Sequence, residues 1–399
     1  MDQLGISVAG RERLGPHPTR ALATRMSGRP GATLWSERAT SQAPYAALAN
    51  RCAGDELELT AGPECVAAAV AAAEIAGATL GDLLDAIAVA AQVEEYLRDW
   101  LMLPLERHGV HPPAALGAVA SSAASARLLQ LPGDRFVGAL ATAAALTPQS
   151  AYVAFSRGAS GKTLYGGWSQ MLGAWSAIWS ETGMAGPATA LEGARGLAQA
   201  LLDAAGTVAP PPFDPDGLAV TRVAFKAYPC NRASHAVLTA IESLPRLPPD
   251  DIEGVAILTY PYAVDLDRRS HGEAPIAAQV SIRRTVALRL VHGGLEPGRA
   301  FTPERLADPR VQRLAHATTV DTLPAETPDA PRRRVARVEV RMSDGTRHHA
   351  DAEARWSLAA PATDAELRTR FEGHTGRCRP FDPWTASDSS SVRRLLATA

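Results

Sequence analysis

The chain has 399 residues, more than one hydrophobic core usually organises, so we expect two domains. Its formal net charge of −2 gives no electrostatic basis for binding nucleic acid or an anionic membrane surface. The start MDQLGISVAG does not read as a signal peptide, and no uncharged apolar run reaches the ~18–20 residues of a membrane span. The four cysteines contain no CxxC pair, which favours reduced thiols in a cytoplasmic protein over disulfides or a zinc site.

Helical patterns fill the first two hundred residues. An Ala-rich run at 63–77 ends at Gly77, a residue typical of helix C-termini. Thr79 and Asp82 then form a capping-box pattern at the start of a second helix, 79–101, whose apolar residues recur at helical spacing. Further Ala-rich segments predict helices at 114–131, 134–147, 168–182 and 188–205.

The pattern changes after the Pro-rich segment 209–217, which cannot continue a helix. The segment 334–354 alternates apolar and charged residues on either side of an Asp344-Gly345 hairpin signal. We expect strands at 218–228, 252–260 and within 334–354, and helices at 232–244, 276–292 and 363–373.

These elements predict a mainly α fold, composed of an all-helical domain and a smaller α+β domain. The helical domain is expected at 1–212 and the α+β domain at 213–357. The C-terminal segment 358–399 is expected to return to the helical domain.

Lysine is almost absent from the chain. Of the forty basic residues thirty-eight are arginine, and the two lysines are Lys162 and Lys226. Arginine solvates a surface as well as lysine does, but it cannot lose its proton or present a compact, movable ammonium group. The two lysines are therefore either left over in an arginine-biased composition or retained for chemistry that arginine cannot do. A P-loop around Lys162 is not supported, because Ser156 stands where the first glycine belongs.

The stretch KAYPCNRASHAVLTAIESL surrounds the second lysine. Asn231 is a candidate N-cap for a helix whose first turn carries Arg232 and His235. Free N–H groups and partial positive charge at a helix start suit a carboxylate or phosphate, and Lys226 and Arg232 would add to them. The same field lowers the pKa of His235, which favours a neutral imidazole able to accept a proton. The alternative is an ordinary solvated helix start.

Two other stretches contain candidate residues. His111 precedes two prolines and an Ala-rich segment, so it is fixed at the start of a helix in either a structural or a catalytic role. In the helical pattern 276–292, Arg283 and Arg284 fill a gap in an apolar stripe. An inward-facing arginine needs an anionic partner, and a bound substrate carboxylate is one candidate.

Over most of its length the chain resembles the MmgE/PrpD family, which includes 2-methylcitrate dehydratases and cis-aconitate decarboxylases. FKAYPCNRASHAVLTAIESL is similar to the family's FK-x-YPCC-x-x-x-H-x-x-IDA motif. HGVHPPAALGAVASSAASARLLQL and GKTLYGGWSQMLG are similar to its G-x-H-P-T and K-x-LH-x-G segments. The resemblance implies a helical domain closed by an α+β lid, an active site between them, a homodimer, and no metal or organic cofactor.

The resemblance also implies roles for single residues. Lys162 and Lys226 stand at two lysines of the family motifs, and His111 and His235 at two histidines of its substrate site. Because the family's substrates are small polycarboxylates, basic side chains would bind carboxylates while a histidine moves the neighbouring proton. The candidates for substrate binding are Lys162, Lys226, Arg232, Arg284, Thr60 and Glu58, and the catalytic candidates are His111, His235 and Tyr165.

The departures from the family pattern concern its acid/base residues. Where the family usually reads H-x-LDFDD followed by a second histidine, this chain reads GDELELTAGP. Asp55 replaces the first histidine, Thr60 stands near the second, and Glu58 stands in for one acid, while the second acid has no counterpart. Tyr165 replaces the histidine of K-x-LH, and Arg284 stands about where the decarboxylases have a tyrosine.

Three functions follow as hypotheses. The first is a repurposed lyase, isomerase or cyclase in a biosynthetic pathway, with His111 or His235 as base and Tyr165 as acid. The second is an orthodox dehydratase or decarboxylase of a citrate- or aconitate-like acid. The third is a non-catalytic protein that binds a carboxylate metabolite.

Overall fold

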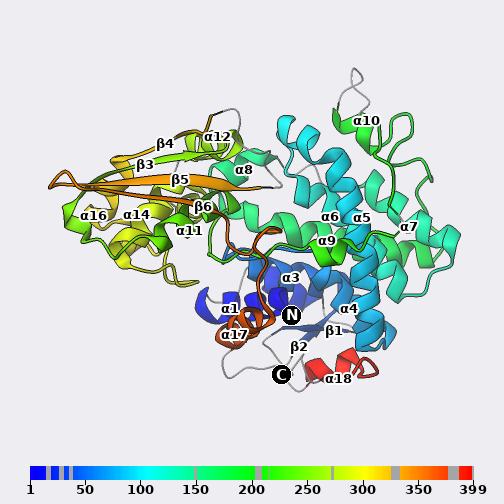
Figure 1. Ribbon diagram of the computed structural model, residues 1–399. Helices are drawn as coiled ribbons and strands as arrows, with labels where there is room; N and C mark the ends of the chain where they lie inside the picture. The colour runs from blue at the N-terminus through cyan, green and yellow to red at the C-terminus, as the bar shows by residue number, and fades with distance from the viewer. Residues whose placement is uncertain are drawn as a thin grey trace.

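A computed structural model describes residues 1–14, 19–26, 31–35, 39–147, 151–202, 209–214, 216–270, 274–324, 333–375 and 386–397. The fold is mainly α, as predicted, with one small mixed sheet. Figure 1 shows the sheet and its helices on one side of the molecule and the N-terminal helices on the other. None of the helices within the described ranges is both long enough and apolar enough to cross a membrane.

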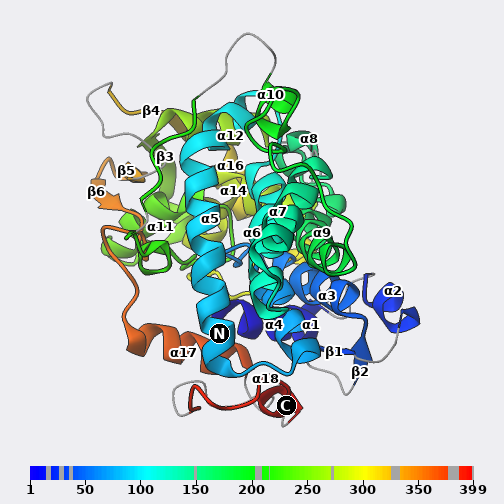
Figure 2. The same cartoon turned by 90° about the vertical axis from the view of Figure 1, so that its right-hand side faces the viewer.

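In the described residues of the N-terminal part, ten α-helices are accompanied by a short two-stranded antiparallel sheet. The prediction of an all-helical domain is wrong in this one respect. Figure 2 shows the long α5 standing upright beside α6, with α7 and α9 on the far side of α6 from α5. The elements are α1 (Asp2–Leu14), α2 (Thr19–Arg25), β1 (Ala32–Leu34), β2 (Ala39–Ser41), α3 (Ala43–Asp55), α4 (Val66–Ala76), α5 (Leu80–Arg107), α6 (Pro112–Leu128), α7 (Gly133–Ala145), α8 (Tyr152–Ser156), α9 (Leu164–Glu181) and α10 (Leu197–Leu202).

Small residues allow α9 to pack closely against both α3 and α6. A Cβ added at Gly173 would lie 2.4 Å from the Cβ of Ser121 on α6, and one at Gly167 would lie 2.8 Å from the carbonyl oxygen of Leu48 on α3. The absence of side chains at these two positions therefore sets the distance between the helices. This packing matters for function, because α3 and α9 both lead into the candidate site.

Two predicted helix boundaries are confirmed in detail. Gly77 ends α4 with a left-handed φ of 67°, and the reciprocal Thr79–Asp82 capping box starts α5. The helix expected at 188–205 is wrong in its first half, since only α10 forms and residues 188–196 make turns. The reason is a close fold of the backbone, in which a Cβ at Gly193 would lie 2.5 Å from the carbonyl oxygen of Thr189.

A four-stranded sheet with strand order β4-β3-β5-β6 organises the C-terminal part. Strand β3 pairs parallel with β4 and antiparallel with β5, which pairs antiparallel with β6 through the predicted hairpin at Asp344-Gly345. The elements are α11 (His235–Ser243), β3 (Ile252–Thr259), α12 (Pro261–Arg269), α13 (Pro275–Val280), α14 (Ile282–His292), α15 (Pro303–Leu306), α16 (Pro309–His316), β4 (Thr318–Thr322), β5 (Val335–Met342) and β6 (Arg347–Glu353).

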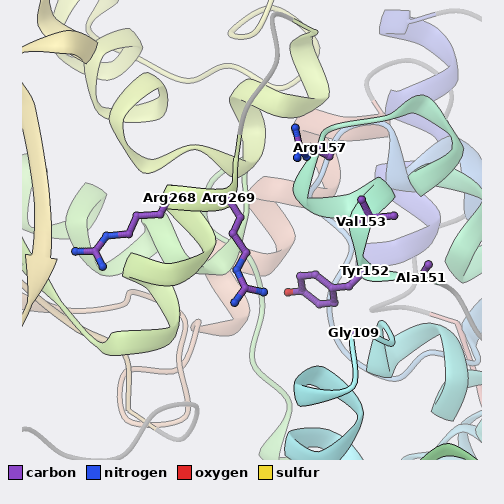
Figure 3. A pocket seen from close by; sticks show the side chains of 7 residues that line it. All are labelled: Gly109, Ala151, Tyr152, Val153, Arg157, Arg268 and Arg269. Atoms are coloured by element: carbon purple, nitrogen blue, oxygen red, sulfur yellow. The ribbon is translucent and has the colours of Figure 1, made fainter.

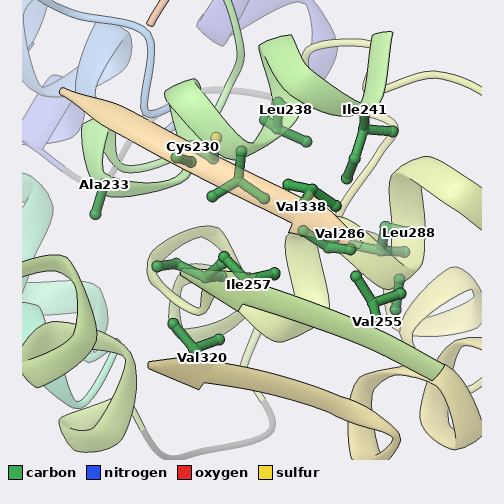
Figure 4. Packing of buried hydrophobic residues seen from close by; sticks show 14 of the residues in the cluster. Cys230, Ala233, Leu238, Ile241, Val255, Ile257, Val286, Leu288, Val320 and Val338 are labelled. Atoms are coloured by element: carbon green, nitrogen blue, oxygen red, sulfur yellow. The ribbon is translucent and has the colours of Figure 1, made fainter. Parts of the chain in front are cut away.

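The inner face of this sheet forms the largest hydrophobic core. Figure 4 shows Val338 of β5 and Ile257 of β3 packed toward Leu238 of α11 and Val286 of α14. Val338 is fully buried, whereas Arg337 beside it is exposed, as the alternating pattern of 334–354 predicts. The core therefore fixes α11, whose first turn faces the candidate site.

Two predictions for the C-terminal part are wrong. The segment 218–228 contains a 3-10 turn (Ala219–Arg222) and no strand. It lies outside the sheet and runs along the N-terminal helices. The single helix expected at 276–292 is two helices that meet at Ser281. There, Asp267 Oδ1 accepts a hydrogen bond from the backbone N–H of Ile282 at 2.8 Å, so the second helix has its own capped start.

The last two helices, α17 (Asp364–Thr375) and α18 (Val392–Ala397), lie against the N-terminal part. Figure 1 shows α17 beside α1, where Phe371 approaches Gly5. We retain the division at residues 212 and 357 as a proposal. Of the four cysteines, Cys52, Cys65 and Cys230 are free, and Cys378 lies outside the described residues.

Candidate active site

Both lysines contact the same buried carboxylate. The ammonium of Lys226 donates to Glu58 Oε1 at 2.7 Å and to the Glu58 carbonyl oxygen at 2.9 Å, while Lys162 donates to Oε2. Lys162 comes from the 3-10 turn before α9, Lys226 from the segment before α11, and Glu58 from the loop after α3. Three stretches far apart in the sequence thus meet at one buried point.

Glu58 has an uncommon backbone conformation. Its φ of 53° lies in the left-handed region, which costs a non-glycine residue about 1–2 kcal/mol. Leu57 and Leu59 on either side are buried in a small hydrophobic cluster, which holds the loop in place. Such strain persists only where the surroundings impose it, and it gathers at functional sites.

The two lysines have one carboxylate between them, because Glu58 is the ion-pair partner of both. The nearby Arg51 is paired with Asp55 at 3.2 Å and with Glu64 at 2.6 Å, so three basic groups face three carboxyl groups and the cluster has excess positive charge only while Glu64 is protonated. Burial lowers the pKa of each lysine to about 7. Near neutral pH one of the two amines is therefore ready to lose its proton or to accept a second anion.

Thr60, two residues after Glu58, already has a hydrogen-bond partner within the protein. Its hydroxyl donates to Asp55 Oδ1 at 2.5 Å, and Asp55 is paired with Arg51. Thr60 therefore helps to position the buried carboxylate of Asp55. Next to this pair, burial raises the pKa of Glu64 to about 7.

His111 lies at the border of the cluster, in an aromatic environment. Its ring centroid is 5.8 Å from that of Tyr152, 5.2 Å from Phe155 and 5.5 Å from Tyr165. Its buried Nδ1 has no hydrogen-bond partner within the part of the chain that the structure describes. Burial lowers the pKa of His111 to about 4, and the Lys162 ammonium lies 5.6 Å from the Phe155 ring. The imidazole is therefore neutral at pH 7.

The hydroxyl of Tyr165 is bound by the backbone. The hydroxyl donates to the carbonyl oxygen of Ala151 at 2.5 Å, and burial raises its pKa. The aromatic ring of Tyr165, and not its hydroxyl, contacts the candidate site, where it packs on the ring of His111.

His235 occupies the predicted helix start. The side chain of Asn231 accepts a hydrogen bond from the N–H of Ala233, so the predicted N-cap is confirmed. His235 Nε2 lies 3.3 Å from the Cys230 carbonyl oxygen. Burial, with a smaller contribution from Lys226, holds the pKa of this imidazole well below its usual range. His235 is therefore neutral at pH 7, as predicted, although burial is the larger cause.

The two arginine candidates differ from the lysines. The buried Arg232 donates to the Ala224 carbonyl oxygen at 2.5 Å, and burial lowers its pKa to about 9. Arg284 lies half-buried at the start of α14. Its neighbour Arg283 has an internal anionic partner, since its Nε donates to the buried Asp267 at 2.9 Å.

Sequence reasoning missed Arg370, which braces the site from α17. The guanidinium donates to the backbone carbonyl oxygens of Lys226 and Leu59 and pairs with Asp2 at 2.7 Å. Nothing in the local pattern of TDAELRTRFEG distinguishes it from the other arginines. Arg51 and Asp55 left a weak signal, as charged residues in the otherwise apolar helix APYAALANRCAGD.

Fold and site together define an enzyme-like architecture, a mainly helical protein whose small α+β part helps to enclose buried ionisable groups. Comparison with models of protein families identifies the family to which the chain belongs. The MmgE/PrpD N-terminal domain matches residues 1–208, and the MmgE/PrpD C-terminal domain matches residues 228–382. The chain therefore belongs to the MmgE/PrpD family, which includes dehydratases and lyases. No curated protein matches it.

Proposed function

We propose that this protein is a divergent MmgE/PrpD-type enzyme, a lyase or isomerase that moves a proton on a small carboxylate-bearing substrate. The observation that carries the proposal is the Lys162–Glu58–Lys226 cluster, in which two ammonium groups share one carboxylate. A substrate carboxylate would give the second ammonium group an anionic partner of its own. The same reasoning explains why arginine did not replace these two residues, since only lysine can release a proton when the site is empty.

The chemistry follows from charge. A carboxylate held by ammonium groups withdraws electrons from its neighbouring carbon and stabilises negative charge that develops there. The neutral imidazole of His235 or His111 accepts the proton from that carbon. Each histidine is a weak base in the empty site, and the arriving carboxylate raises its pKa. No step in this scheme needs a cofactor.

The altered acid/base residues support a repurposed reaction, such as isomerisation, cyclisation or an unusual elimination in a biosynthetic pathway. Thr60 and Tyr165, which stand where the family has histidines, both donate their hydroxyl protons to groups of the protein itself. The runner-up is an orthodox dehydratase or decarboxylase, which the two lysines and two histidines at family positions favour. We further propose a cytoplasmic homodimer, in keeping with the family resemblance.

A substrate assay distinguishes these functional hypotheses. Absorbance at about 240 nm is followed with 2-methylcitrate, citrate and cis-aconitate, beside a thermal-shift screen of other di- and tricarboxylates. We expect carboxylate binding without ordinary turnover of the three standard acids. The true reaction, once found, should be lost in His235→Asn or His111→Asn. Ordinary turnover of a standard acid would establish that the protein is an orthodox dehydratase or decarboxylase. Thermal stabilisation of the protein by a carboxylate, without any turnover that depends on the histidines, would establish that it is a non-catalytic binding protein. If no carboxylate binds, the proposal is wrong.

Carboxylate binding should also take up a proton above pH 7. Below the lysine pKa of about 7 the amines are already charged, and above it one must be protonated as the ligand binds. The affinity for a bound carboxylate is therefore expected to fall by up to ~10-fold per pH unit above 7. Calorimetry at pH 8 in buffers of different ionisation enthalpy measures the uptake directly. Zero uptake would show that the amines are fully charged in the empty site.

A further inference from the structure

A second feature, outside the lysine cluster, is a pocket between the end of α8 and the end of α12. Its volume is about 410 Å³, within the ~300–1,000 Å³ of small-molecule sites. Figure 3 shows the guanidinium of Arg269 directed toward the Tyr152 hydroxyl, with Arg157 on the opposite helix, while Arg268 turns outward. Its lining residues are Gly109, Ala151, Tyr152, Val153, Arg157, Arg268 and Arg269.

The charge of this pocket is positive. Three of its lining residues are arginines and none is acidic. Arg269 pairs with Asp265 at 3.0 Å, but both side chains are more than half exposed, at 65% and 52%. Exposed pairs of this kind contribute only ~0–1 kcal/mol, so the guanidinium is available to a better-placed anion. Its planar fork matches a carboxylate or a phosphate.

The pocket is joined to the loop that carries His111. The Tyr152 N–H donates to the Gly109 carbonyl oxygen at 2.7 Å, and Val110 forms a bridge with Ala151. The Tyr152 ring lines the pocket and also packs on the His111 ring, at 5.8 Å between centroids. Contacts among the rings of Tyr152, His111 and Phe155 thus connect the pocket with Lys162 of the lysine cluster.

We infer that this pocket binds a second anionic group of the substrate, a carboxylate or phosphate several bonds away from the reacting end. The volume exceeds what a lone carboxylate needs, which indicates an extended group in place of the compact acids of the standard reactions. This inference rests on the proposed function, because it assumes that the reacting end enters the Lys162–Lys226 cluster. Arg157 and Arg269 then determine specificity for the distant anion.

Calorimetry with a matched pair of probes tests this inference. Pimelate carries two carboxylates, and its monomethyl ester keeps the length but only one; 6-phosphonohexanoate replaces the distal carboxylate with a phosphonate. In the wild-type protein we expect a diacid to bind at least ~10-fold more tightly than the ester, as for a charged hydrogen bond gained. In Arg157→Gln/Arg269→Gln this ratio should fall to about 1 while ester binding is unchanged. Arg337→Gln, which removes an equally exposed paired arginine on β5, should preserve the ratio.

The outcomes separate this inference from the proposed function. A ratio near 1 in the wild type for both pimelate and the phosphonate, or a ratio that the double variant does not change, overturns the second anion site. Lys226→Met should weaken the ester and both diacids alike. If it leaves all three unchanged while the arginines still set the ratio, the proposed function fails and the pocket stands. The tighter of the two diacids identifies the distal group.

Discussion

Glu58→Gln should destabilise the protein by about 3–5 kcal/mol at pH 7, the range found when one partner of a buried ion pair is removed. The substitution leaves Lys162 and Lys226 facing each other without a counter-charge, in a site that excludes water. The loop also loses the two contacts that hold Glu58 in its left-handed conformation. Urea unfolding at pH 7 measures the loss as a shift in midpoint.

The loss should shrink as the pH rises. In the folded wild type the pKa of each lysine is about 7, and without Glu58 it should fall further because the counter-charge is gone. Between the lower pKa of the variant and 7, the folded wild type binds more protons than the folded variant, so the loss should be largest near pH 6 and should shrink as the pH rises to 8. Glu253→Gln, at an exposed pair with Arg341, is the control and should cost ~1 kcal/mol or less. A loss at Glu58 that does not depend on pH would contradict the charge assignment.

The sequence predicted the fold best where the signal was local. The capping box at Thr79, the left-handed Gly77 and the hairpin at Asp344-Gly345 each depend on neighbouring residues alone, and each is present. A strand was wrongly predicted at 218–228, because whether such a segment joins the sheet depends on where the chain runs relative to the sheet edges. Alternating residues cannot report that, because pairing is decided by distant segments.

The site was predictable as a set of residues, and much less so as a geometry. The rarity of lysine indicated Lys162 and Lys226, and the structure brings them together on Glu58. Their mutual partner was not expected, because a carboxylate 104 residues from one lysine and 168 from the other has no local signature. One arginine of the apolar stripe has its anion within the protein, since Arg283 pairs with Asp267 of a preceding helix, while substrate binding by Arg284 stays a prediction.

Lys226→Met should leave the fold nearly intact and remove carboxylate binding. Methionine fills much of the same space, and the remaining Lys162–Glu58 pair is electrically balanced, so we expect the free energy of unfolding to change by about 1 kcal/mol. The ammonium group that shares Glu58 with Lys162 is gone, however, so a substrate carboxylate loses its partner in the site. A charged hydrogen bond is worth about 1.5–3 kcal/mol, so affinity should fall ~10- to 100-fold. Calorimetry with the best carboxylate of the thermal-shift screen measures the loss.

Lys226→Arg is the matched variant and addresses why lysine is there. Arginine keeps the positive charge but cannot release its proton, so binding should persist while the dependence of affinity on pH above 7 is reduced and proton uptake at pH 8 falls. The empty site would then hold a permanent positive charge at position 226, and the folded protein should be less stable than the wild type at pH 8 to 9. If arginine instead reproduces the wild-type affinity, pH dependence and stability, Lys226 is merely a leftover of composition, and the proton-linked role assigned to it is wrong.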